Sequence, residues 1–327
     1  MILDTYDRNH TYLRISLTDL CNLRCFYCMP DENYDFMPTR HLMQPAEIEA
    51  IAAVFVRLGV TKIRLTGGEP LARRDFDDIL MRLSLLPVEL TLTTNATLLH
   101  RHLDTLQLAG VRSLNISLDT LSAERFFQLT RRDKFSQTMR NIRTAIDRGF
   151  HVKINTVVMN GVNADEVLGF VAWTKDDPID VRFIEFMPFE GNRWTGDQVF
   201  PKQEIMNLVT EQYHAVPLRH DPHATSQPYQ VPGHQGTFAI ISTMSAPFCS
   251  GCNRMRLTAD GKMKNCLFSK TESDLLSALR SGKPLEQFIR KNILGKAERL
   301  GGQFGDIPFK DLPGDKLVNR SMISIGG

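Results

Sequence analysis

Residues 14–28 read Arg-Ile-Ser-Leu-Thr-Asp-Leu-Cys-Asn-Leu-Arg-Cys-Phe-Tyr-Cys. The first half of this segment predicts a β-strand. The cysteines that follow it, Cys21, Cys25 and Cys28, are spaced C-x3-C-x2-C. Thiolates ligate iron–sulfur clusters well, and a cubane held by three cysteines keeps one iron free for another ligand. The segment therefore predicts a strand that leads into a cluster-binding loop.

A second group of three cysteines lies at the other end of the chain. Cys249, Cys252 and Cys266 follow a C-x2-C-x13-C spacing, so the six cysteines divide into two triplets with none left over. Structural zinc normally takes four protein ligands, and three thiolates suit it poorly unless a histidine completes the site. The pattern favours two open 4Fe–4S cubanes, about eight irons per chain. The alternatives are an inert thiol cluster for the first triplet and a zinc ribbon or redox motif for the second.

Composition and charge restrict the class of protein. The chain has 327 residues, 42% of them hydrophobic and 23% charged, which is ordinary for a globular protein. A net charge of +2 gives no global attraction to nucleic acid or to an anionic membrane. No apolar run approaches the roughly 18 residues of a membrane span, and the N-terminus lacks the regions of a secretory signal. We therefore expect a cytoplasmic protein whose cysteines bind metal rather than form disulfides.

Strand and helix patterns alternate along the first part of the chain. Helical periodicity is clearest at residues 45–58, 76–85, 136–148 and 164–173. Six short apolar or β-branched runs predict strands at residues 13–18, 62–66, 90–94, 113–118, 152–158 and 181–186. Six strand–helix units predict an α/β fold, a partial β/α barrel with its site at the carboxyl ends of the strands.

The remaining two fifths of the chain, from residue 195 onward, are less regular. Five prolines and four histidines fall within residues 195–235 and favour a polar linker over a metal site. A strand at 237–243, a strand pair turned at Asp260-Gly261, and helices at 271–279 and 284–296 follow. We expect a partial barrel over residues 1–194, a linker and connecting helix over 195–236, and a smaller C-terminal α+β domain over 237–327. That domain would close the barrel mouth and carry an auxiliary cluster and a Gly-Gly tail.

The first cysteine loop resembles that of the radical S-adenosylmethionine enzymes. These hold a 4Fe–4S cluster on C-x3-C-x2-C, with an aromatic residue before the last cysteine, and use it to split S-adenosylmethionine into methionine and a 5′-deoxyadenosyl radical. The Leu65-Thr-Gly-Gly-Glu-Pro70 segment resembles the motif with which this family binds the methionine amine. Glycines let a backbone approach a ligand, and a carboxylate pairs with an ammonium. The contacts to S-adenosylmethionine that the resemblance implies are Tyr27, Gly67, Gly68, Glu69, Ser117 and Met187.

Further motifs narrow the resemblance. The two triplets, the Lys62–Pro70 block, Arg182-Phe-Ile-Glu-Phe-Met187, Cys249-x-x-Cys-Asn-Arg-x-Arg256 and a terminal Ile-Gly-Gly are together similar to the GTP 3′,8-cyclase family of molybdenum cofactor biosynthesis. The resemblance implies conversion of GTP to (8S)-3′,8-cyclo-7,8-dihydroguanosine 5′-triphosphate. The radical would take hydrogen from ribose C3′, and the carbon radical would attack guanine C8. In this family the second cluster meets the guanine. The implied GTP contacts are Arg14, Arg64, Thr93, Lys153, Arg254 and Arg256.

The resemblance also gives the chain terminus a role. It implies that Gly326 and Gly327 thread between the clusters and take part in catalysis, although a terminal Gly-Gly is normally a frayed end. Two positions depart from the family pattern: Ala96 stands where glycine is usual, and Ser324 where tyrosine is common. The implied partners are GTP, an electron donor such as flavodoxin or ferredoxin, and molybdenum cofactor biosynthesis protein C downstream. A homodimer is compatible with the resemblance.

Other functions fit parts of the sequence. Another radical S-adenosylmethionine enzyme with an auxiliary cluster, such as a peptide maturase, commonly carries more C-terminal cysteines. An iron–sulfur electron-transfer or sensing protein would not need the Gly67–Glu69 segment. A tRNA modifier would need a basic tract that the chain lacks.

Overall fold

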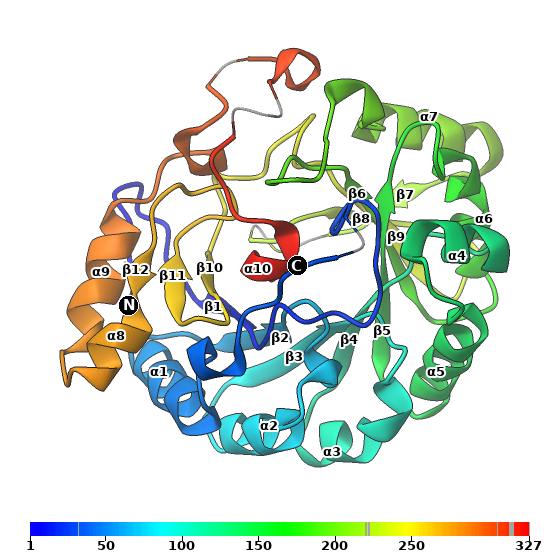
Figure 1. Cartoon of the computed structure of the whole chain (residues 1–327). Coiled ribbons are helices and arrows are strands. Elements are labelled where there is room, and N and C mark those ends of the chain that lie inside the picture. The colour runs from blue at the N-terminus through cyan, green and yellow to red at the C-terminus, as the bar shows by residue number, and fades with distance from the viewer. Residues whose placement is uncertain (32, 220, 222, 306, 314–316, 327) are drawn as a thin grey trace.

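The computed structural model describes residues 1–31, 33–219, 221, 223–305, 307–313 and 317–326. Within these residues one twelve-stranded sheet runs in the order β12-β11-β10-β1-β2-β3-β4-β5-β6-β9-β8-β7. Neighbouring strands from β10 to β9 in that order pair in parallel, and antiparallel strands extend both edges. The sheet curves around a central space, and helices ring its outer face (Figure 1).

The strands are short, as expected for a barrel. The parallel ones are β1 (Tyr12–Ser16), β2 (Lys62–Thr66), β3 (Glu89–Thr94), β4 (Ser113–Ser117), β5 (His151–Val158), β6 (Asp180–Glu185), β9 (Thr237–Ile241) and β10 (Arg254–Leu257). The antiparallel edge strands are β7 (Val216–Pro217), β8 (Gln227–Gln230), β11 (Lys262–Lys264) and β12 (Ser273–Asp274). The six predicted strands of the N-terminal part correspond to β1–β6, so the partial β/α barrel is confirmed.

The helices lie mostly between successive strands. Their bounds are α1 (Pro45–Arg57), α2 (Phe76–Ser84), α3 (Leu103–Leu108), α4 (Ala123–Thr130), α5 (Phe135–Asp147), α6 (Val167–Trp173), α7 (Lys202–Gln212), α8 (Leu275–Arg280), α9 (Leu285–Leu294) and α10 (Met322–Ile325). Among the residues described, every helix is too short or too polar to span a bilayer. The start of α1 at Pro45 is explained by a reciprocal capping box between the N-cap residue Gln44 and Glu47, and by the proline in the first turn.

Strands β1, β2 and β10 have an apolar outer face and a polar inner face. In β1, Leu13 and Ile15 are fully buried within the main hydrophobic core, while Tyr12, Arg14 and Ser16 occupy the alternate positions. Successive side chains of a strand point to opposite faces, so the polar set faces the centre of the barrel. The hydrophobic core therefore lies between the sheet and the outer helices, and polar side chains of the strands face the barrel interior.

The C-terminal part of the chain continues the barrel sheet. Strand β9 pairs with β6 and β10 pairs with β1, so residues beyond 236 provide a parallel strand at each side of the six-strand core. The turn at Asp260-Gly261 joins β10 to β11 as predicted. The predicted linker contains α7, β7 and β8. The three-part division remains a prediction, since all three parts contribute to one sheet.

The last described segment of the chain, residues 317–326, which we call the tail, ends at the barrel mouth (Figure 1). Figure 1 shows α10 at the centre of the ring, far in sequence from the strands around it. Ile325 is 1% exposed and belongs to a second hydrophobic cluster with Phe186, Trp194 and Phe268. The last described turn is therefore packed against the body of the protein.

Candidate functional site

The first cysteine triplet follows β1 at the carboxyl end of the barrel. Cys21, Cys25 and Cys28 are free, half-buried thiols. Burial raises the pKa of Cys21 to about 11, with a further contribution from the nearby Glu69 carboxylate. The Asn95 side-chain amide donates to Cys21 Sγ at 3.9 Å. An N–H group directed at a cysteine sulfur is typical of iron–sulfur sites.

The second triplet lies around the β10–β11 hairpin and has a cationic environment. Lys296 Nζ donates to Cys252 Sγ at 3.4 Å, and the backbone N–H of Leu300 donates to Cys249 Sγ at 3.5 Å. Burial opposes ionisation of Cys252, but Arg254 and Lys296 outweigh it and lower the pKa of this thiol to about 7. The two triplets thus differ in charge: carboxylates lie near the first and cations near the second.

The arrangement of the cysteine side chains distinguishes iron–sulfur ligation from binding of a single metal ion. Among the described residues, no three His, Cys, Asp or Glu side chains are grouped so as to bind one metal ion. The thiolates of a cubane each bind a different iron, so they need not converge on a single point as zinc ligands do. Free thiols with N–H donors to sulfur fit iron–sulfur ligation.

The Gly67–Glu69 segment packs against the backbone that leads into the first cysteine loop. A Cβ on Gly67 would lie 2.5 Å from the Thr18 carbonyl oxygen, and one on Gly68 would lie 2.4 Å from that of Asp19. Gly68 N donates to Thr18 O at 2.7 Å. The glycines are therefore required by contact with another strand end, in addition to any ligand contact.

Glu69 itself is fully buried and hydrogen-bonded within the protein. Its carboxylate accepts from Thr94 Oγ1 and Asn95 N, both at 2.7 Å, and from Leu71 N at 3.0 Å. Burial raises its pKa to about 7 despite these bonds. Glu69 does not line the cavity described next, whereas Thr94 and Asn95 do. The structure thus shows Glu69 joining the ends of β2 and β3, and its predicted role at the methionine amine remains a prediction.

A cavity of about 160 Å³ opens beside the first triplet. Its lining includes residues from the ends of several strands and two from the tail: Cys21, Cys25, Tyr27, Cys28, Thr66, Gly67, Gly68, Thr93, Ser117, Asp119, Asn155, Met322 and Ile323. Four of the predicted cofactor contacts, Tyr27, Gly67, Gly68 and Ser117, are therefore brought together. Met187 does not line it and packs against the second hydrophobic cluster instead.

Asp119, at the end of β4, is a cavity residue that the sequence reasoning missed. Its carboxylate accepts from the Tyr27 hydroxyl at 2.6 Å and from Val157 N at 2.9 Å. Burial raises its pKa to about 6. The pair fixes the Tyr27 ring beside Cys25 and Cys28. A polar residue directly after a barrel strand is the signal that would have identified Asp119.

A cluster of basic side chains faces the barrel interior. Arg14 lies directly between Arg64 and Arg256 in the strand register. Burial, together with the charges of Arg256 and Arg64, holds the pKa of Arg14 well below its ordinary value. We call the whole set the basic cluster: Arg14, Lys62, Arg64, Lys153, Arg182, Arg254 and Arg256.

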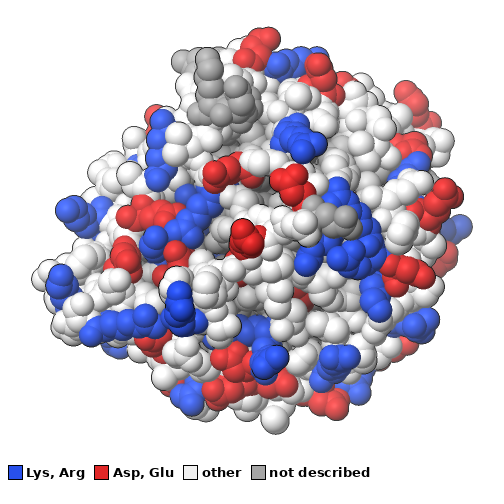
Figure 2. Space-filling view, viewed as in Figure 1, with Lys and Arg blue, Asp and Glu red and all other residues white. Residues whose placement is uncertain are grey.

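The basic cluster is only partly neutralised by acidic residues. Lys62 pairs with Glu89 at 2.7 Å, and Asp180 lies near Lys153 and Arg182. On the face shown in Figure 2, lysines and arginines are interspersed with acidic residues. Buried like charges are costly unless an anion is bound, and an interior of this kind predicts a polyanionic ligand.

Several buried polar atoms of the barrel interior have no hydrogen-bond partner within the described part of the chain. These are Tyr12 Oη, Arg14 Nε, Thr93 Oγ1, Asn115 Oδ1, Asn155 Oδ1 and Arg182 Nε. Buried polar groups are normally paired, and each exception calls for an explanation. Because these atoms come from neighbouring barrel strands and include donors and acceptors, a bound polar molecule with anionic groups would satisfy them. The sequence did not identify four further site residues, Lys62, Arg182, Asn115 and Asn155. Each alternates with apolar positions in its strand, and this alternation is the signal that indicates a side chain facing the barrel interior.

The tail brings Gly326 to the basic cluster. Arg256 Nη1 donates to the Gly326 carbonyl oxygen, and Gly326 adopts a φ of 84°. A Cβ at this position would lie 2.9 Å from both the Ser16 Cβ and the Thr66 Cγ2. Only glycine fits here without displacing the barrel wall. Gly327 lies outside the described residues.

Comparison with known proteins gives two matched regions of the chain. The Radical SAM superfamily profile matches residues 15–174, and that of Molybdenum Cofactor Synthesis C matches residues 179–301. The structure of Streptococcus suis SuiB has a TM-score of 0.61 at 15% identity, covering 88% of this chain and 67% of SuiB. SuiB bound to S-adenosylmethionine gives 0.58 at 17% identity, covering 83% and 65%. Fold and cysteine loop thus define a radical S-adenosylmethionine protein.

Sequence relatives specify the family. GTP 3′,8-cyclase, mitochondrial, of Arabidopsis thaliana is 44% identical over 333 residues, covering the whole chain and 84% of the relative. GTP 3′,8-cyclase of Rhodopirellula baltica is 40% identical, covering 89% of this chain and 83% of the relative. Human molybdenum cofactor biosynthesis protein 1 is 44% identical over 95% of this chain, which spans half of that protein. The chain belongs to the GTP 3′,8-cyclase family.

Proposed function

We propose that the chain converts GTP to (8S)-3′,8-cyclo-7,8-dihydroguanosine 5′-triphosphate, the first step of molybdenum cofactor biosynthesis. The observation that carries this proposal is the basic cluster in the barrel interior, next to buried donors and acceptors that have no partner among the described residues. A triphosphate supplies the missing negative charge, and a ribose and a base supply the missing hydrogen-bond partners. Anaerobic incubation with GTP and S-adenosylmethionine tests the proposal, with the product separated from GTP by chromatography and identified by nuclear magnetic resonance, because the two nucleotides are isomers.

The residues present fit the groups that this chemistry needs. Cys21, Cys25 and Cys28 would hold one 4Fe–4S cluster, and Cys249, Cys252 and Cys266 another, both with N–H donors to sulfur. The first cluster and S-adenosylmethionine would together supply a 5′-deoxyadenosyl radical. The protein's own part is to bind the cofactor in the cavity, to fix Tyr27 through Asp119, and to exclude water from the barrel mouth with α10.

The basic cluster would bind and orient the triphosphate. Guanidinium groups offer paired N–H donors that match phosphate oxygens, and Arg14, Arg64 and Arg256 occupy adjacent strands at the same level. Thr93 would add a hydroxyl from β3, since its Oγ1 is buried and unpaired. Arg254 lies closer to the second triplet, where its charge acts on Cys252. Orientation of the ribose toward the cavity would follow from anchoring the phosphates at the opposite side.

The affinity for GTP should depend on pH through Lys153. Burial and the neighbouring Arg182 lower the pKa of Lys153 to about 8, and only the protonated amine pairs with phosphate. As pH rises from 7 to 9 the free protein loses this proton, so the affinity should fall by about tenfold. Binding titrations across this range should show the fall in the unaltered protein and its absence in Lys153→Arg, which stays charged.

Arg64→Ala is the variant matched to Lys153→Arg. It removes a positive charge at every pH, whereas Lys153 of the unaltered protein loses its charge only as the pH rises. Hydrogen bonds to charged groups contribute roughly 1.5–3 kcal/mol, so GTP affinity should drop by about ten- to a hundredfold at every pH. Unaltered affinity in Arg64→Ala, or the same pH dependence in Lys153→Arg as in the unaltered protein, would contradict this assignment of phosphate contacts.

Lys296 should raise the reduction potential of the second cluster. Its ammonium donates to Cys252 Sγ, and positive charge and hydrogen bonds at sulfur favour the reduced form. Lys296→Met should lower the midpoint potential of this cluster by roughly 60 mV, the equivalent of one charge-assisted hydrogen bond for a one-electron couple. A redox titration followed by electron paramagnetic resonance measures both clusters, and the first serves as internal reference. Lys296→Arg should keep the original value, and an unchanged potential in Lys296→Met would refute the assignment.

We further propose two protein partners for this activity. An electron donor such as flavodoxin or ferredoxin would reduce the clusters, and molybdenum cofactor biosynthesis protein C would take the cyclised nucleotide onward. The family membership supports this place in the pathway. A homodimer remains a prediction.

A further inference from the structure

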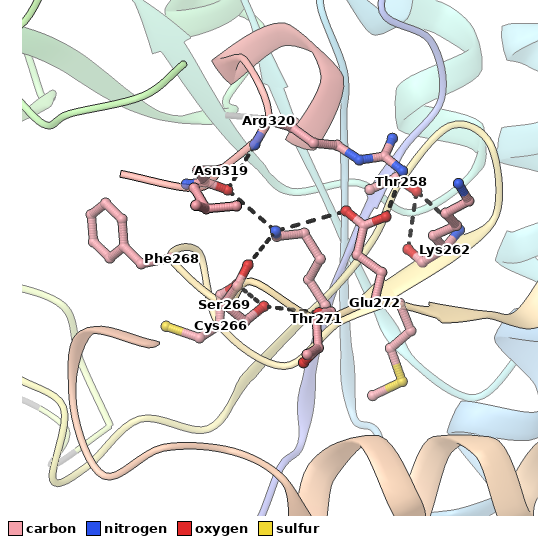
Figure 3. Close-up of polar contacts among 12 residues, drawn as sticks. Thr258, Lys262, Cys266, Phe268, Ser269, Thr271, Glu272, Asn319 and Arg320 are labelled. Carbon is pink, nitrogen blue, oxygen red and sulfur yellow. Dashed lines mark hydrogen bonds and ion pairs between the residues drawn. The ribbon is translucent and has the colours of Figure 1, made fainter. Parts of the chain in front are cut away.

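A network of charged side chains ties the tail to the β10–β11 hairpin (Figure 3). Arg320, in the segment before α10, donates through both terminal nitrogens to the Asp260 carboxylate at 3.0 and 3.1 Å. The same guanidinium donates to Glu272 at 2.5 Å. These side chains are only 16–22% exposed. A paired guanidinium–carboxylate contact at this depth fixes direction as well as distance.

A second, more deeply buried cation extends the network. Lys264 has a side chain 2% exposed, and its Nζ donates to Ser269 O at 2.6 Å and to Asn319 Oδ1 at 3.2 Å. Nζ also lies 3.7 Å from Glu272, and Asn319 donates to Leu267 O at 3.1 Å. A lysine this buried is normally found only when paired. Residues 319 and 320 are therefore both held by the hairpin and by the loop after it.

The same hairpin also holds the far end of α10. Arg256 is directly opposite Lys264 in the strand register, and it donates to the Gly326 carbonyl. Asp260 lies in the turn between the two strands. One hairpin thus contacts the tail both before and after α10. Cys266 follows Lys264 by two residues, so this rigid element carries the tail and part of the second triplet together.

The tail has little structure of its own that would keep it in place. Helix α10 has four residues, and isolated helices of that length are not stable in water. The other contacts of the tail include the packing of Ile325 in the second hydrophobic cluster, a Tyr34–Ser321 hydroxyl pair at 2.9 Å, and two hydrogen bonds between Gln303 and the Val318 backbone at 2.9 and 3.1 Å. The charged network adds ion pairs to these contacts.

We propose that Arg320 is a positioning residue: its ion pairs with Asp260 and Glu272 latch the tail to the β10–β11 hairpin and so place Gly326 beside the basic cluster. This inference rests on the proposed function for the reaction that it serves. Loss of the latch would leave the clusters and the phosphate contacts in place and free the end of the chain.

The test compares Arg320→Ala with Arg280→Ala in the full-length, cluster-loaded protein. Arg280 makes a similar two-bond pair with Glu47 at 2.7 and 3.1 Å, on the outer helices, and is the matched control. Arg320→Ala should speed amide hydrogen exchange at residues 322–326 by about tenfold. It should also lower the cyclised nucleotide formed per 5′-deoxyadenosine by about tenfold or more. Iron content and GTP affinity should stay within twofold, about the scatter of such measurements. Arg320→Lys, which keeps the charge without the fork, should be intermediate.

Two results would overturn the latch. One is an unchanged rate of amide hydrogen exchange in α10 of Arg320→Ala. The other is faster exchange in α10 while the amount of cyclised nucleotide formed per 5′-deoxyadenosine stays at the value of the unaltered protein. Should the unaltered protein make no cyclised nucleotide, the proposed function fails, while the exchange measurement still decides whether Arg320 holds the tail.

Discussion

Replacing Cys25 with serine should abolish formation of 5′-deoxyadenosine from S-adenosylmethionine. Cys25 is one of the three thiols that would hold the first cluster, and a serine hydroxyl is a poor ligand for iron. Iron content should fall from about eight to about four per chain. GTP should still bind, because the basic cluster and the second triplet are unaltered. Iron analysis, electron paramagnetic resonance and product analysis under strictly anaerobic conditions measure these quantities.

Cys252→Ser is the matched variant for the second triplet. It should also halve the iron, but the spectrum that remains should be that of the first cluster, and S-adenosylmethionine should still broaden or shift it. A protein that holds tightly bound zinc and only one cluster's worth of iron would contradict the assignment of both triplets.

Deleting Gly326 and Gly327 should remove the cyclised product while cleavage of S-adenosylmethionine continues. The deletion takes away the carbonyl that Arg256 binds and the backbone that contacts Ser16 and Thr66. Misplacement of groups by about 1 Å can cost roughly a hundredfold in rate, and we expect at least that loss of product. Iron content, thermal stability and GTP affinity should be nearly unchanged, since the core lies elsewhere.

Gly326→Ala provides a finer version of the same experiment. The added methyl group would meet the barrel wall at 2.9 Å and would have to adopt a positive φ, so product formation should fall with the chain length intact. A truncated protein that makes the cyclised nucleotide at the full-length rate would show that the tail is an ordinary chain end.

The sequence predicts the barrel strands well because their signal is local. Strand β2 has the predicted bounds, and the other five differ by one or two residues. The short helices α3 and α4 escape prediction because each buries only two or three side chains, too few for a clear period. The pairing of β1 with β10 joins Tyr12 to Arg254, and no local pattern specifies a contact across most of the chain.

Prediction of the site is likewise limited to what local sequence patterns specify. Cysteine spacing identifies both triplets, but the partners of their sulfur atoms, such as Lys296, come from distant segments. Glu69 is a motif residue whose carboxylate accepts hydrogen bonds from within the protein, from Thr94 and Asn95. Ala96, where glycine is usual, is fully buried with a φ of 60°, a conformation that favours glycine. Its carbonyl accepts a hydrogen bond from Asn141 at 2.6 Å, which helps to hold this backbone.

The central claim is that this chain cyclises GTP by radical chemistry. The most direct measurement is an anaerobic reaction of the reconstituted, reduced protein with S-adenosylmethionine and GTP deuterated at ribose C3′. The account predicts a nucleotide triphosphate that separates from GTP by chromatography and has the mass of unlabelled GTP, because it has lost the deuterium. It should form together with 5′-deoxyadenosine that carries the deuterium. Formation of 5′-deoxyadenosine without deuterium and with GTP recovered intact would contradict it.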